Sequence, residues 1–501
     1  MTSYTLRSAS PAKTRVDAVV VGVVSTRKGV EIAPGGEDVA AAWGRSWRPL
    51  VTHLGIKATP GSVTTLPTTG RIKSPLLVLV GLGAASEVDQ IVVRRAAGVA
   101  ARAVPNAASL ALALPADEPA LVRAALEGFV LGGYRFTAYK SARSTDKAPT
   151  EVVVLAAGAR RREFVDAFNQ AQVVTDAIRV TRDWVNTPPA DLTPPKFAEA
   201  VAAEHKMRAK GRTKQLTMTV HDEEALAELG FGGTLGVGQG SDAPPRLVEV
   251  RWTPADPVAH LAFVGKGVTF DSGGLAIKPA ASMPEMKCDM AGAAAVLMAT
   301  YAIAALDLPV QISAFAPMAE NMISGTSFRP GDVLSVYGGQ TVEIRNPDAE
   351  GRLLLADALV LAGEQEPDLM VDVATLTGAM HLALGDKVAG VLGTDAVVDE
   401  VLAAGRAAGE ALWPMPITEE VVERVDASPI ADVLQSDLVR WGGGLYAAAF
   451  LQRFVGDMPW GHLDIAGPAF NSGGAYGHVA SGGTGFAVAT LVELARARAA
   501  R

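Results

Sequence analysis

The sequence predicts an α/β protein of two domains, each built on a mainly buried sheet that helices flank. Its 501 residues exceed what one hydrophobic core usually serves. Short aliphatic or β-branched runs alternate with alanine-rich stretches of helical character, which is typical of buried strands in an α/β layer. A content of 49% apolar and 20% charged residues is ordinary for a globular protein. The expected strands lie at residues 19–21, 76–80, 152–155, 261–264, 310–315 and 369–373.

A long amphipathic helix is expected from Arg160 to Val185. Two prolines, Pro188 and Pro189, end it, because proline cannot continue a helix. We place the domain boundary along this helix. The predicted organisation is an N-terminal α/β domain over residues 1–162, a connecting helix over 163–187 and a larger C-terminal domain over 188–501.

The longest apolar helical candidate runs from Ala291 to Leu306. Polar residues interrupt it and Asp307 follows it, so it falls short of the roughly 20 residues that span a bilayer. We expect a buried helix and no membrane association. The single cysteine, Cys288, cannot form an intramolecular disulfide, and the N-terminus lacks the features of a signal peptide. A cytoplasmic setting is therefore expected.

The net charge of -8 hides an asymmetry. Residues 1–150 carry 18 Lys and Arg against 10 Asp and Glu, a net of +8, whereas residues 151–501 have a net of -16. A basic segment can indicate nucleic-acid binding, but these charges are scattered and have little aromatic interleaving. A solvated basic surface is the simpler interpretation, and DNA binding is the alternative.

The most informative segment is residues 346–353, Asn-Pro-Asp-Ala-Glu-Gly-Arg-Leu. It places Asp348, Glu350 and Arg352 at alternating positions beside an apolar run. Charges next to buried chain are costly unless they are paired or bound to an ion, so the segment is either a salt-bridged cluster or an ion site. Asp348 and Glu350 point the same way only if the stretch is extended. We therefore expect an extended approach and a helix that begins near Leu353.

A second polar segment, residues 264–274, follows directly on an expected strand. Ligand sites in open α/β sheets lie beyond the carboxyl ends of strands, which is where Lys266 and Asp271 would fall. Further along the chain, Lys278 precedes a proline and Asp289 stands just before the apolar helix. Taken alone, these four residues have ordinary interpretations, which are a loop lysine, an Asx turn, a surface lysine and a helix N-cap.

Taken together, these residues indicate a metal centre. The carboxylates of Asp271, Asp289, Asp348 and Glu350 would repel one another and raise their pKa values unless cations sat between them. Two divalent ions would supply that charge, and a water that bridges paired metals becomes a hydroxide near neutral pH. The sequence has no Gly-x-Ser-x-Gly, His-Glu-x-x-His or paired cysteines that would favour other hydrolytic chemistry. A carboxylate-rich site without sulfur suits Mn, Mg, Co or Zn.

Residues 264–274 and 346–353 closely resemble the signature segments of the leucyl aminopeptidase family, the cytosol aminopeptidases that use two metals. The hallmark of that family reads Asn-Thr-Asp-Ala-Glu-Gly-Arg-Leu, and here Pro347 replaces the threonine. The proline fits an extended approach to Asp348 but removes one backbone donor. The similarity covers residues 180–490 and continues through the segments 182–188, 236–241, 320–322, 374–379 and 462–467.

The resemblance implies a role for each matching residue. The implied metal ligands are Lys266, Asp271, Asp289, Asp348 and Glu350, of which Asp271 and Glu350 would bridge two divalent ions. A lysine must be neutral to bind a metal, so the ion has to lower a pKa that is ordinarily about 10.4. Lys278 would stabilise the oxyanion, and Arg352 would hold the bicarbonate that serves as general base. The implied substrate-binding residues are Met286, Thr375, Leu376, Gly378 and Ala466, with a core role as the alternative for Met286 and Ala466.

The resemblance implies a cytoplasmic leucyl aminopeptidase that removes N-terminal, preferably apolar residues from peptides. Manganese or zinc is the expected metal, with magnesium or cobalt as further options. Family analogy implies a homohexamer. Three alternatives stay open, which are an additional DNA-binding role for the basic N-terminal part, a narrow dipeptidase such as one for cysteinylglycine, and a scaffold that has lost its metals.

Overall fold

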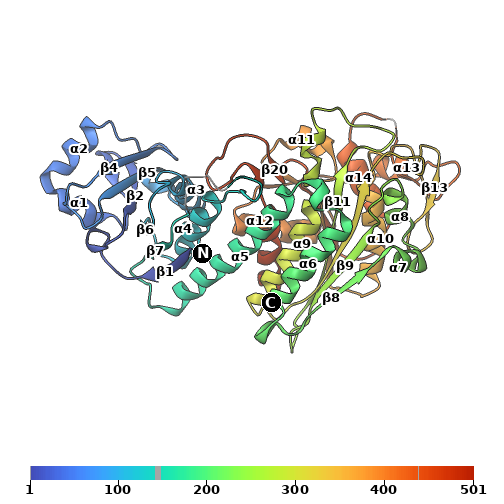
Figure 1. Ribbon diagram of the computed structural model, residues 1–501, viewed down its shortest axis with the longest axis horizontal. Coiled ribbons are helices and arrows are strands. Elements are labelled where there is room, and N and C mark those ends of the chain that lie inside the picture. Colours follow the sequence, from blue (N-terminus) through green and yellow to red (C-terminus); the bar gives the residue numbers. More distant parts are fainter. Residues whose placement is uncertain (1, 142–147, 438) are drawn as a thin grey trace. The chain divides into compact units, whose positions relative to one another are not determined.

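The computed structural model describes residues 2–141, 148–437 and 439–501 (Figure 1). It divides into two compact units. Unit 1 holds residues 1–176 with 473–481, and unit 2 holds residues 177–472 with 482–501. Helix α5 (Arg162–Asn186) runs through the division and confirms the long helix that the sequence predicts. The predicted domain limits at residues 162 and 187 stay a prediction.

Unit 1 is built on a sheet of seven described strands in the order β1-β7-β6-β2-β5-β4, with β3 paired to β2. Strands β1, β7, β6, β2 and β5 are parallel, whereas β3 and β4 are antiparallel to their neighbours. The strands are β1 (Ser3–Arg7), β2 (Ala18–Thr26), β3 (Gly29–Ile32), β4 (Val63–Pro67), β5 (Leu76–Ala84), β6 (Ser109–Ala113) and β7 (Glu151–Leu155).

Both faces of this sheet are buried. Val20 of β2 joins a core with α3 (Gln90–Ala101), α4 (Pro119–Gly132) and the start of α5. Its neighbours Val19 and Val21 join a second core with α1 (Glu37–Trp43) and α2 (Trp47–His53). Successive side chains of a strand point to opposite faces, so a sheet that is covered on both sides requires consecutive aliphatic residues.

Unit 2 is built on a mixed sheet of nine described strands in the order β17-β16-β19-β15-β10-β12-β9-β8, with β11 paired to β12. The central strands β19, β15, β10 and β12 are parallel. The strands are β8 (Leu216–His221), β9 (Arg246–Trp252), β10 (His260–Gly265), β11 (Gly267–Asp271), β12 (Gln311–Asn321), β15 (Leu369–Ala374), β16 (Ala389–Gly393), β17 (Leu412–Pro414) and β19 (Trp460–Asp464). Two small sheets accompany it, formed by β13 (Val333–Ser335), β14 (Thr341–Glu343) and β18 (Val433–Leu434), and by β20 (Phe470–Asn471) and β21 (Gly482–Gly483).

Helices cover both faces of the large sheet. Ala262 and Val264 of β10 join the core that α10 and α14 form, whereas a side chain at Gly265 would meet Ala293 and Val296 of α9. The helices of unit 2 besides α5 are α6 (Pro194–Arg208), α7 (Glu223–Leu229), α8 (Gly232–Gly238), α9 (Ala291–Ala305), α10 (Gly351–Gly363), α11 (Gly378–Leu384), α12 (Asp395–Ala408), α13 (Glu419–Val425), α14 (Gly443–Gln452) and α15 (Val488–Ala499).

The predicted α/β class, with a mainly buried sheet in each part, is confirmed. Each of the six predicted strand segments lies in a strand, and β12 begins one residue later than expected. The apolar helix is buried, as predicted. With the helical turn that precedes α9, the stretch Met283–Ala305 is long and apolar enough to cross a membrane, but 94% of its most apolar window is buried inside the protein. Such burial is typical of a core helix.

Candidate metal centre

The candidate site lies where the parallel strands of unit 2 end. Lys266 follows β10, Asn321 ends β12, Thr375 follows β15 and Asp464 ends β19. Because these strands are parallel neighbours, their carboxyl ends meet at one edge of the sheet. This edge is where the sequence leads us to expect a ligand site.

Lys266 is buried, so its interpretation as an ordinary loop lysine is wrong. Its ammonium donates to Oδ1 of Asp289 at 2.8 Å and to the carbonyl oxygen of Thr375 at 3.0 Å. The same Nζ lies 2.9 Å from Oε1 of Glu350. Gly351 permits this approach, since a Cβ at that position would lie 2.6 Å from Nζ.

Asp289 does not cap the helix that follows it. Met290 occupies the N-cap position of α9, and the cap makes no side-chain hydrogen bond. Oδ1 of Asp289 instead accepts from Lys266 and from the hydroxyl of Thr375, each at 2.8 Å. The buried carboxylate therefore faces the other charged groups of the site.

Asp271 forms an Asx turn and also faces the site. Its Oδ1 accepts from the N–H of Gly273 and from the amide of Asn321, each at 2.8 Å. Its Oδ2 lies 2.7 Å from Nζ of Lys278, which also pairs with Asp348 at 2.5 Å. The Lys278 side chain is only 16% exposed, so it is not a free surface lysine.

Residues 346–349 form a turn, and the predicted extended approach is wrong. The N–H of Ala349 donates to the carbonyl oxygen of Asn346 at 2.9 Å, and the N–H of Asp348 donates to Oδ1 of Asn346 at 3.0 Å. The short amide side chain of Asn346 offers the backbone this alternative to an extended chain. Pro347 takes the first corner, where its fixed φ is favoured and no N–H is needed. Helix α10 consequently begins at Gly351, two residues earlier than predicted.

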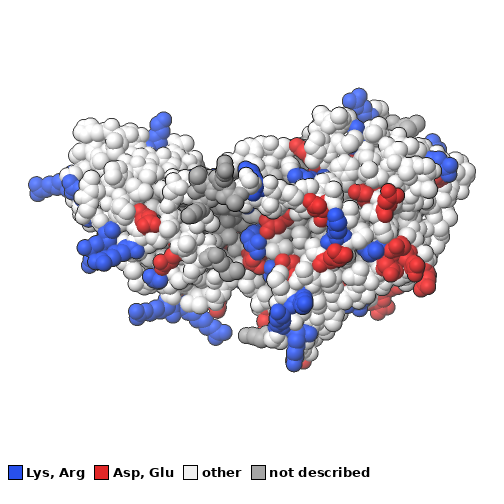
Figure 2. Space-filling view, viewed as in Figure 1, with Lys and Arg blue, Asp and Glu red and all other residues white. Residues whose placement is uncertain are grey.

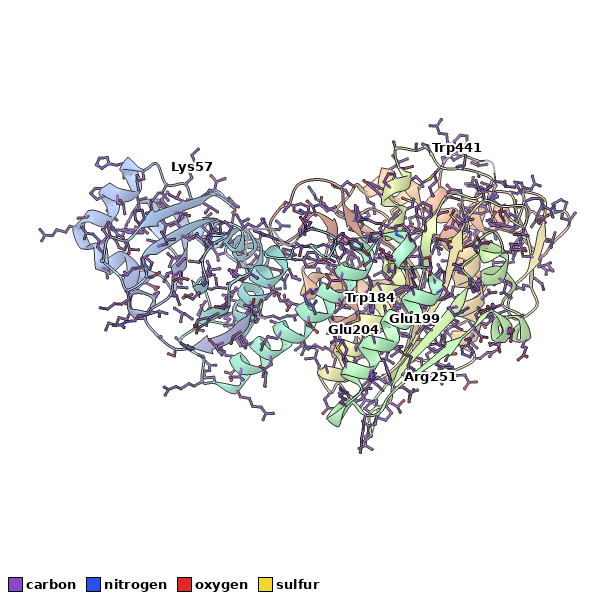
Figure 3. The ribbon with its side chains drawn as sticks, viewed as in Figure 1. Lys57, Trp184, Glu199, Glu204, Arg251 and Trp441 are labelled. Carbon is purple, nitrogen blue, oxygen red and sulfur yellow. The ribbon has the colours of Figure 1, made fainter. Side chains whose placement is uncertain are left out.

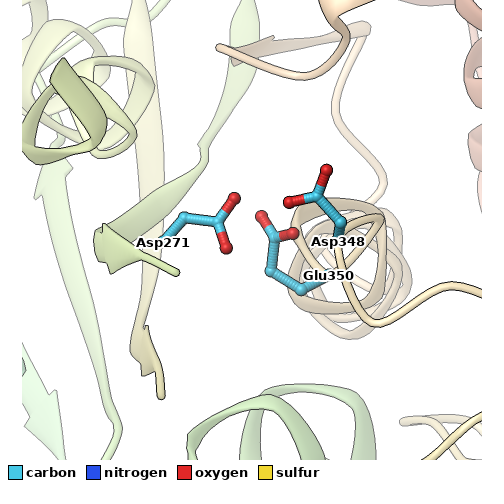
Figure 4. Close-up of side chains that lie close together, drawn as sticks. All are labelled: Asp271, Asp348 and Glu350. Carbon is cyan, nitrogen blue, oxygen red and sulfur yellow. The ribbon is translucent and has the colours of Figure 1, made fainter. Parts of the chain in front are cut away.

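The turn still brings the two acidic residues of the octapeptide to one place. Asp271, Asp348 and Glu350 each offer a carboxylate oxygen, and these oxygens lie within 4.8 Å of one another (Figure 4). Glu350 is buried, and its Oε2 has no hydrogen-bond partner among the described residues. The Lys266 ammonium faces Oε1 at 2.9 Å, but a buried carboxylate with an unpartnered second oxygen is costly unless a further cation faces it.

The charges of the site do not balance by themselves. Two lysine ammonium groups stand against four carboxylates. Burial raises the pKa of Asp271 to about 7, and the Glu350 carboxylate adds to the effect. Burial also raises the pKa values of Asp289 and Asp348. Bound cations would neutralise this excess of negative charge.

The carboxylates of the site favour the charged form of Lys266. Burial favours the neutral amine of Lys266, but Asp289 and Glu350 outweigh burial and raise its pKa above the ordinary range. If Lys266 binds a metal, it has to lose this proton, and the charge of the ion would drive the loss. The donor set of carboxylate oxygens with one amine therefore fits divalent ions such as Mn, Mg, Co or Zn.

Arg352 belongs to a separate part of the site. Its Nη1 donates to the carbonyl oxygen of Gln435 at 2.7 Å, and its guanidinium lies over the rings of Tyr446 and Phe450 at 5.7 and 5.9 Å. No described residue accepts a hydrogen bond from its buried Nε. The carboxylates of the octapeptide therefore pair with Lys266 and Lys278 and not with Arg352. The Nε of Arg352 stays available to donate to an anion.

Three of the candidate substrate-binding residues, Leu376, Gly378 and Ala466, lie on two segments that Asp464 joins. Its Oδ1 accepts from the N–H groups of Leu376 and Ala466 at 3.2 and 3.1 Å, and its Oδ2 accepts from the hydroxyl of Thr377 at 2.7 Å. Gly378 is exposed at the start of α11. A single buried carboxylate thus sets the relative position of both segments.

The two remaining candidates contact the metal ligands or their neighbours. Thr375 provides its carbonyl oxygen to Lys266 and its hydroxyl to Asp289, so it orders the ligand groups besides lying in a substrate segment. Met286 is half-buried in the helical turn Met283–Cys288, which leads directly to Asp289.

Three buried polar residues of the site have no role in the sequence analysis. Asn321 and Asp464 lie within segments that resemble the family. That resemblance is the only feature of the sequence that points to them. Gln435 lies outside all of those segments and reaches the 346–349 turn because β14 and β18 pair. No local pattern predicts such a long-range contact.

The chain matches known proteins over nearly its full length. Residues 179–492 match the catalytic domain of the Cytosol aminopeptidase family, and residues 20–143 match the N-terminal domain of the same family. The chain belongs to this family. The probable cytosol aminopeptidase of Streptomyces avermitilis is 47% identical over 520 residues, which cover 100% of this chain and 99% of that one. The corresponding protein of Micrococcus luteus is 46% identical over 463 residues, or 89% of each chain.

Solved structures agree with this assignment. The bottromycin maturation enzyme BotP in complex with Mn is 37% identical, with a TM-score of 0.84 over 97% of this chain and 100% of BotP. A tomato leucine aminopeptidase variant is 29% identical, with a TM-score of 0.88 over 99% of this chain and 96% of that chain. The predicted family and enzyme class are confirmed, and the chain is a metal-binding peptidase.

Proposed function

We propose that this cytosol aminopeptidase removes N-terminal, preferably apolar residues such as leucine from peptides, with two divalent ions bound. The observation that carries the proposal is the cluster of four carboxylates, three of them buried, around two lysines, which needs additional positive charge. The similarity to the tomato protein, which is named a leucine aminopeptidase, supports the substrate preference.

Five side chains would hold the ions. When bound, two divalent ions polarise the scissile carbonyl and lower the pKa of a bound water. Manganese or zinc is proposed, with magnesium or cobalt as further options, and the Mn complex of BotP supports manganese. The residues that would hold the ions are Lys266, Asp271, Asp289, Asp348 and Glu350.

Lys278 would stabilise the oxyanion that develops on the scissile carbonyl. Asp271 and Asp348 hold its Nζ in place. These carboxylates also keep the ammonium charged, because they raise its pKa despite burial. A donor that is positioned before the reaction needs no reorganisation, and one such donor is worth about 2.7–4 kcal/mol in the transition state.

Arg352 would hold a bicarbonate ion, which would supply a proton acceptor beside the scissile bond. Its unbonded Nε is the donor for that anion, and the carbonyl oxygen of Gln435 fixes the opposite side of the guanidinium. Guanidinium groups match planar oxyanions well because they present their donors as a rigid fork.

The substrate would lie along the segment Thr375–Gly378, whose backbone groups would orient it. Met286 and Ala466 would contribute to the pocket for the first side chain. Asp464 would fix the distance between Leu376 and Ala466, because it accepts a hydrogen bond from the backbone N–H of each. A half-buried methionine and an alanine make an apolar lining, which accounts for the preference for apolar residues.

A cytoplasmic location and a homohexamer are also proposed. The names of the relatives, which are cytosol aminopeptidases, support the location. The hexamer rests on analogy within the family, and sedimentation of the purified protein tests it.

The test of the proposed function is release of leucine from a leucyl amide with added Mn or Zn. Glu350→Ala and Lys278→Ala should each abolish the activity. Glu199→Ala and Lys57→Ala are matched controls, because both side chains are exposed (Figure 3). If either site variant matches its control, the site assignment is wrong. A panel of dipeptides in the same assay separates a broad aminopeptidase from a narrow one such as a cysteinylglycinase.

The basic N-terminal part carries the second candidate function, DNA binding. Lys and Arg outnumber Asp and Glu on the visible surface of this part (Figure 2). Some of these charges are paired, as in Arg7 with Glu151 and Arg48 with Glu31. Retention on DNA that weakens steeply with salt would support binding, and no retention at low salt would exclude it.

A further inference from the structure

Gln435 is a buried glutamine beside the candidate metal centre. It follows β18, which pairs in parallel with β14, and this pairing places it next to the turn that carries Asp348. Its side chain has no exposed surface. A buried amide has to find all of its hydrogen-bond partners within the protein.

The amide of Gln435 uses both its acceptor and its donor groups on that turn. Its Oε1 accepts from the N–H groups of Arg345 and Asn346 at 3.2 and 3.0 Å. Its Nε2 donates to the carbonyl oxygens of Asn346 and Ala349 at 2.8 and 3.0 Å. A carboxylate could accept but not donate, so an amide is the side chain that satisfies all four backbone groups.

The backbone of Gln435 holds a further charged residue of the octapeptide. Its carbonyl oxygen accepts from Nη1 of Arg352 at 2.7 Å. Its own N–H donates to the carbonyl oxygen of Glu343 at 2.9 Å, which anchors it to β14. One residue therefore contacts the backbone on both sides of Asp348 and also the guanidinium that follows Glu350.

We propose that Gln435 is a positioning residue of the metal centre. It holds the 346–349 turn so that Asp348 and Glu350 face the same ion, and it fixes Arg352 beside them. This inference rests on the proposed function, in which both carboxylates bind metal. Groups that orient metal ligands from outside the coordination sphere change metal affinity or activity by about 10–100-fold.

Calorimetric titration of the metal-free full-length protein with Mn²⁺ tests the inference. Gln435→Met keeps the size and neutrality of the side chain but removes its donors and acceptors, so Mn²⁺ should bind about 10–100-fold more weakly. Gln435→Asn keeps the amide on a shorter stem and should show a smaller loss. Gln452→Met is the matched control, because Gln452 is exposed at the end of α14, and it should bind Mn²⁺ as the wild type does.

A second measurement separates positioning from general stability. The rise in Tm that Mn²⁺ causes should be smaller in both Gln435 variants than in the wild type, because this rise depends on metal affinity. Variants with a lower metal-free Tm but the wild-type affinity for Mn²⁺ would overturn the inference. If Gln435→Met does not fold, the affinity of Gln435→Asn decides. A wild type that binds no Mn²⁺ or Zn²⁺ would instead overturn the proposed function itself.

Discussion

Replacing Gly351 with alanine tests whether the position of Lys266 matters for the reaction. Gly351 is the first residue of α10, and an added Cβ would lie 2.3 Å from Cε and 2.6 Å from Nζ of Lys266. Carbon atoms in contact are about 3.5–4.0 Å apart, so the lysine has to move by about 1 Å or more. It cannot do so without lengthening its contacts to Asp289, Glu350 and Thr375.

The size of the effect follows from this displacement. A misplacement of about 1 Å can lower the rate by about 100-fold. Overpacking costs about 1–3 kcal/mol, whereas alanine is favoured over glycine in a helix by about 0.5–1 kcal/mol. Gly351→Ala should therefore fold, with a free energy of unfolding lowered by at most about 2.5 kcal/mol, and lose most of its activity.

Gly363→Ala is the matched control. Gly363 ends the same helix, and nothing lies within 4 Å of its added Cβ. Release of leucine from a leucyl amide with added Mn measures activity, and denaturant unfolding measures stability. If folded Gly351→Ala hydrolysed the substrate as fast as Gly363→Ala, the reaction would not depend on the position of Lys266, and its role as a metal ligand would be refuted.

Three further perturbations test the site and unit 1. Asp464→Ala removes the acceptor that joins the two substrate segments, so KM should rise more than kcat falls, and an unchanged KM would contradict the substrate assignment. Removing divalent metals with a chelator should abolish activity and lower Tm, with recovery on adding Mn or Zn; activity that survives complete chelation would contradict metal dependence. In unit 1, burial raises the pKa of Glu127, but Arg123 and Arg94 outweigh burial and hold it below its ordinary range. Its carboxylate therefore stabilises the fold above the unfolded pKa of about 4.3, and this contribution is lost as pH falls through the lower folded pKa. Glu127→Gln should lower the free energy of unfolding by about 3–5 kcal/mol at neutral pH, and the difference from wild type should shrink as the denaturation is repeated at lower pH. A difference that did not change with pH would contradict the ionised state of Glu127.

The fold class could be predicted because its signals are local. Consecutive aliphatic residues such as Val19–Val21 are required wherever both faces of a sheet are covered, whatever covers them. Likewise, Pro188 and Pro189 predict the end of α5 from the covalent structure of proline alone. Which strands are neighbours could not be read from these runs, because pairing depends on the path of the whole chain.

The charged residues of the site were also visible in the sequence, but their arrangement was not. Asp348 and Glu350 face one place through a turn that Asn346 and Pro347 form, and not through an extended chain. Asp289 by itself matches an ordinary N-cap, and only its grouping with the other carboxylates assigns it to the site, because its partners Lys266 and Thr375 are distant in sequence.

The sequence by itself determined which chemical groups the site contains, because its two signature segments carry Lys266, Asp271, Asp348, Glu350 and Arg352, and Lys278 and Asp289 follow the first of them. The tertiary structure alone decided how these groups are divided. Lys266 and Lys278 pair with the carboxylates, while Arg352 is held apart by Gln435. The physical reason is that a buried charge or amide is stable only where partners satisfy it, and those partners come from strands that meet only in the folded protein.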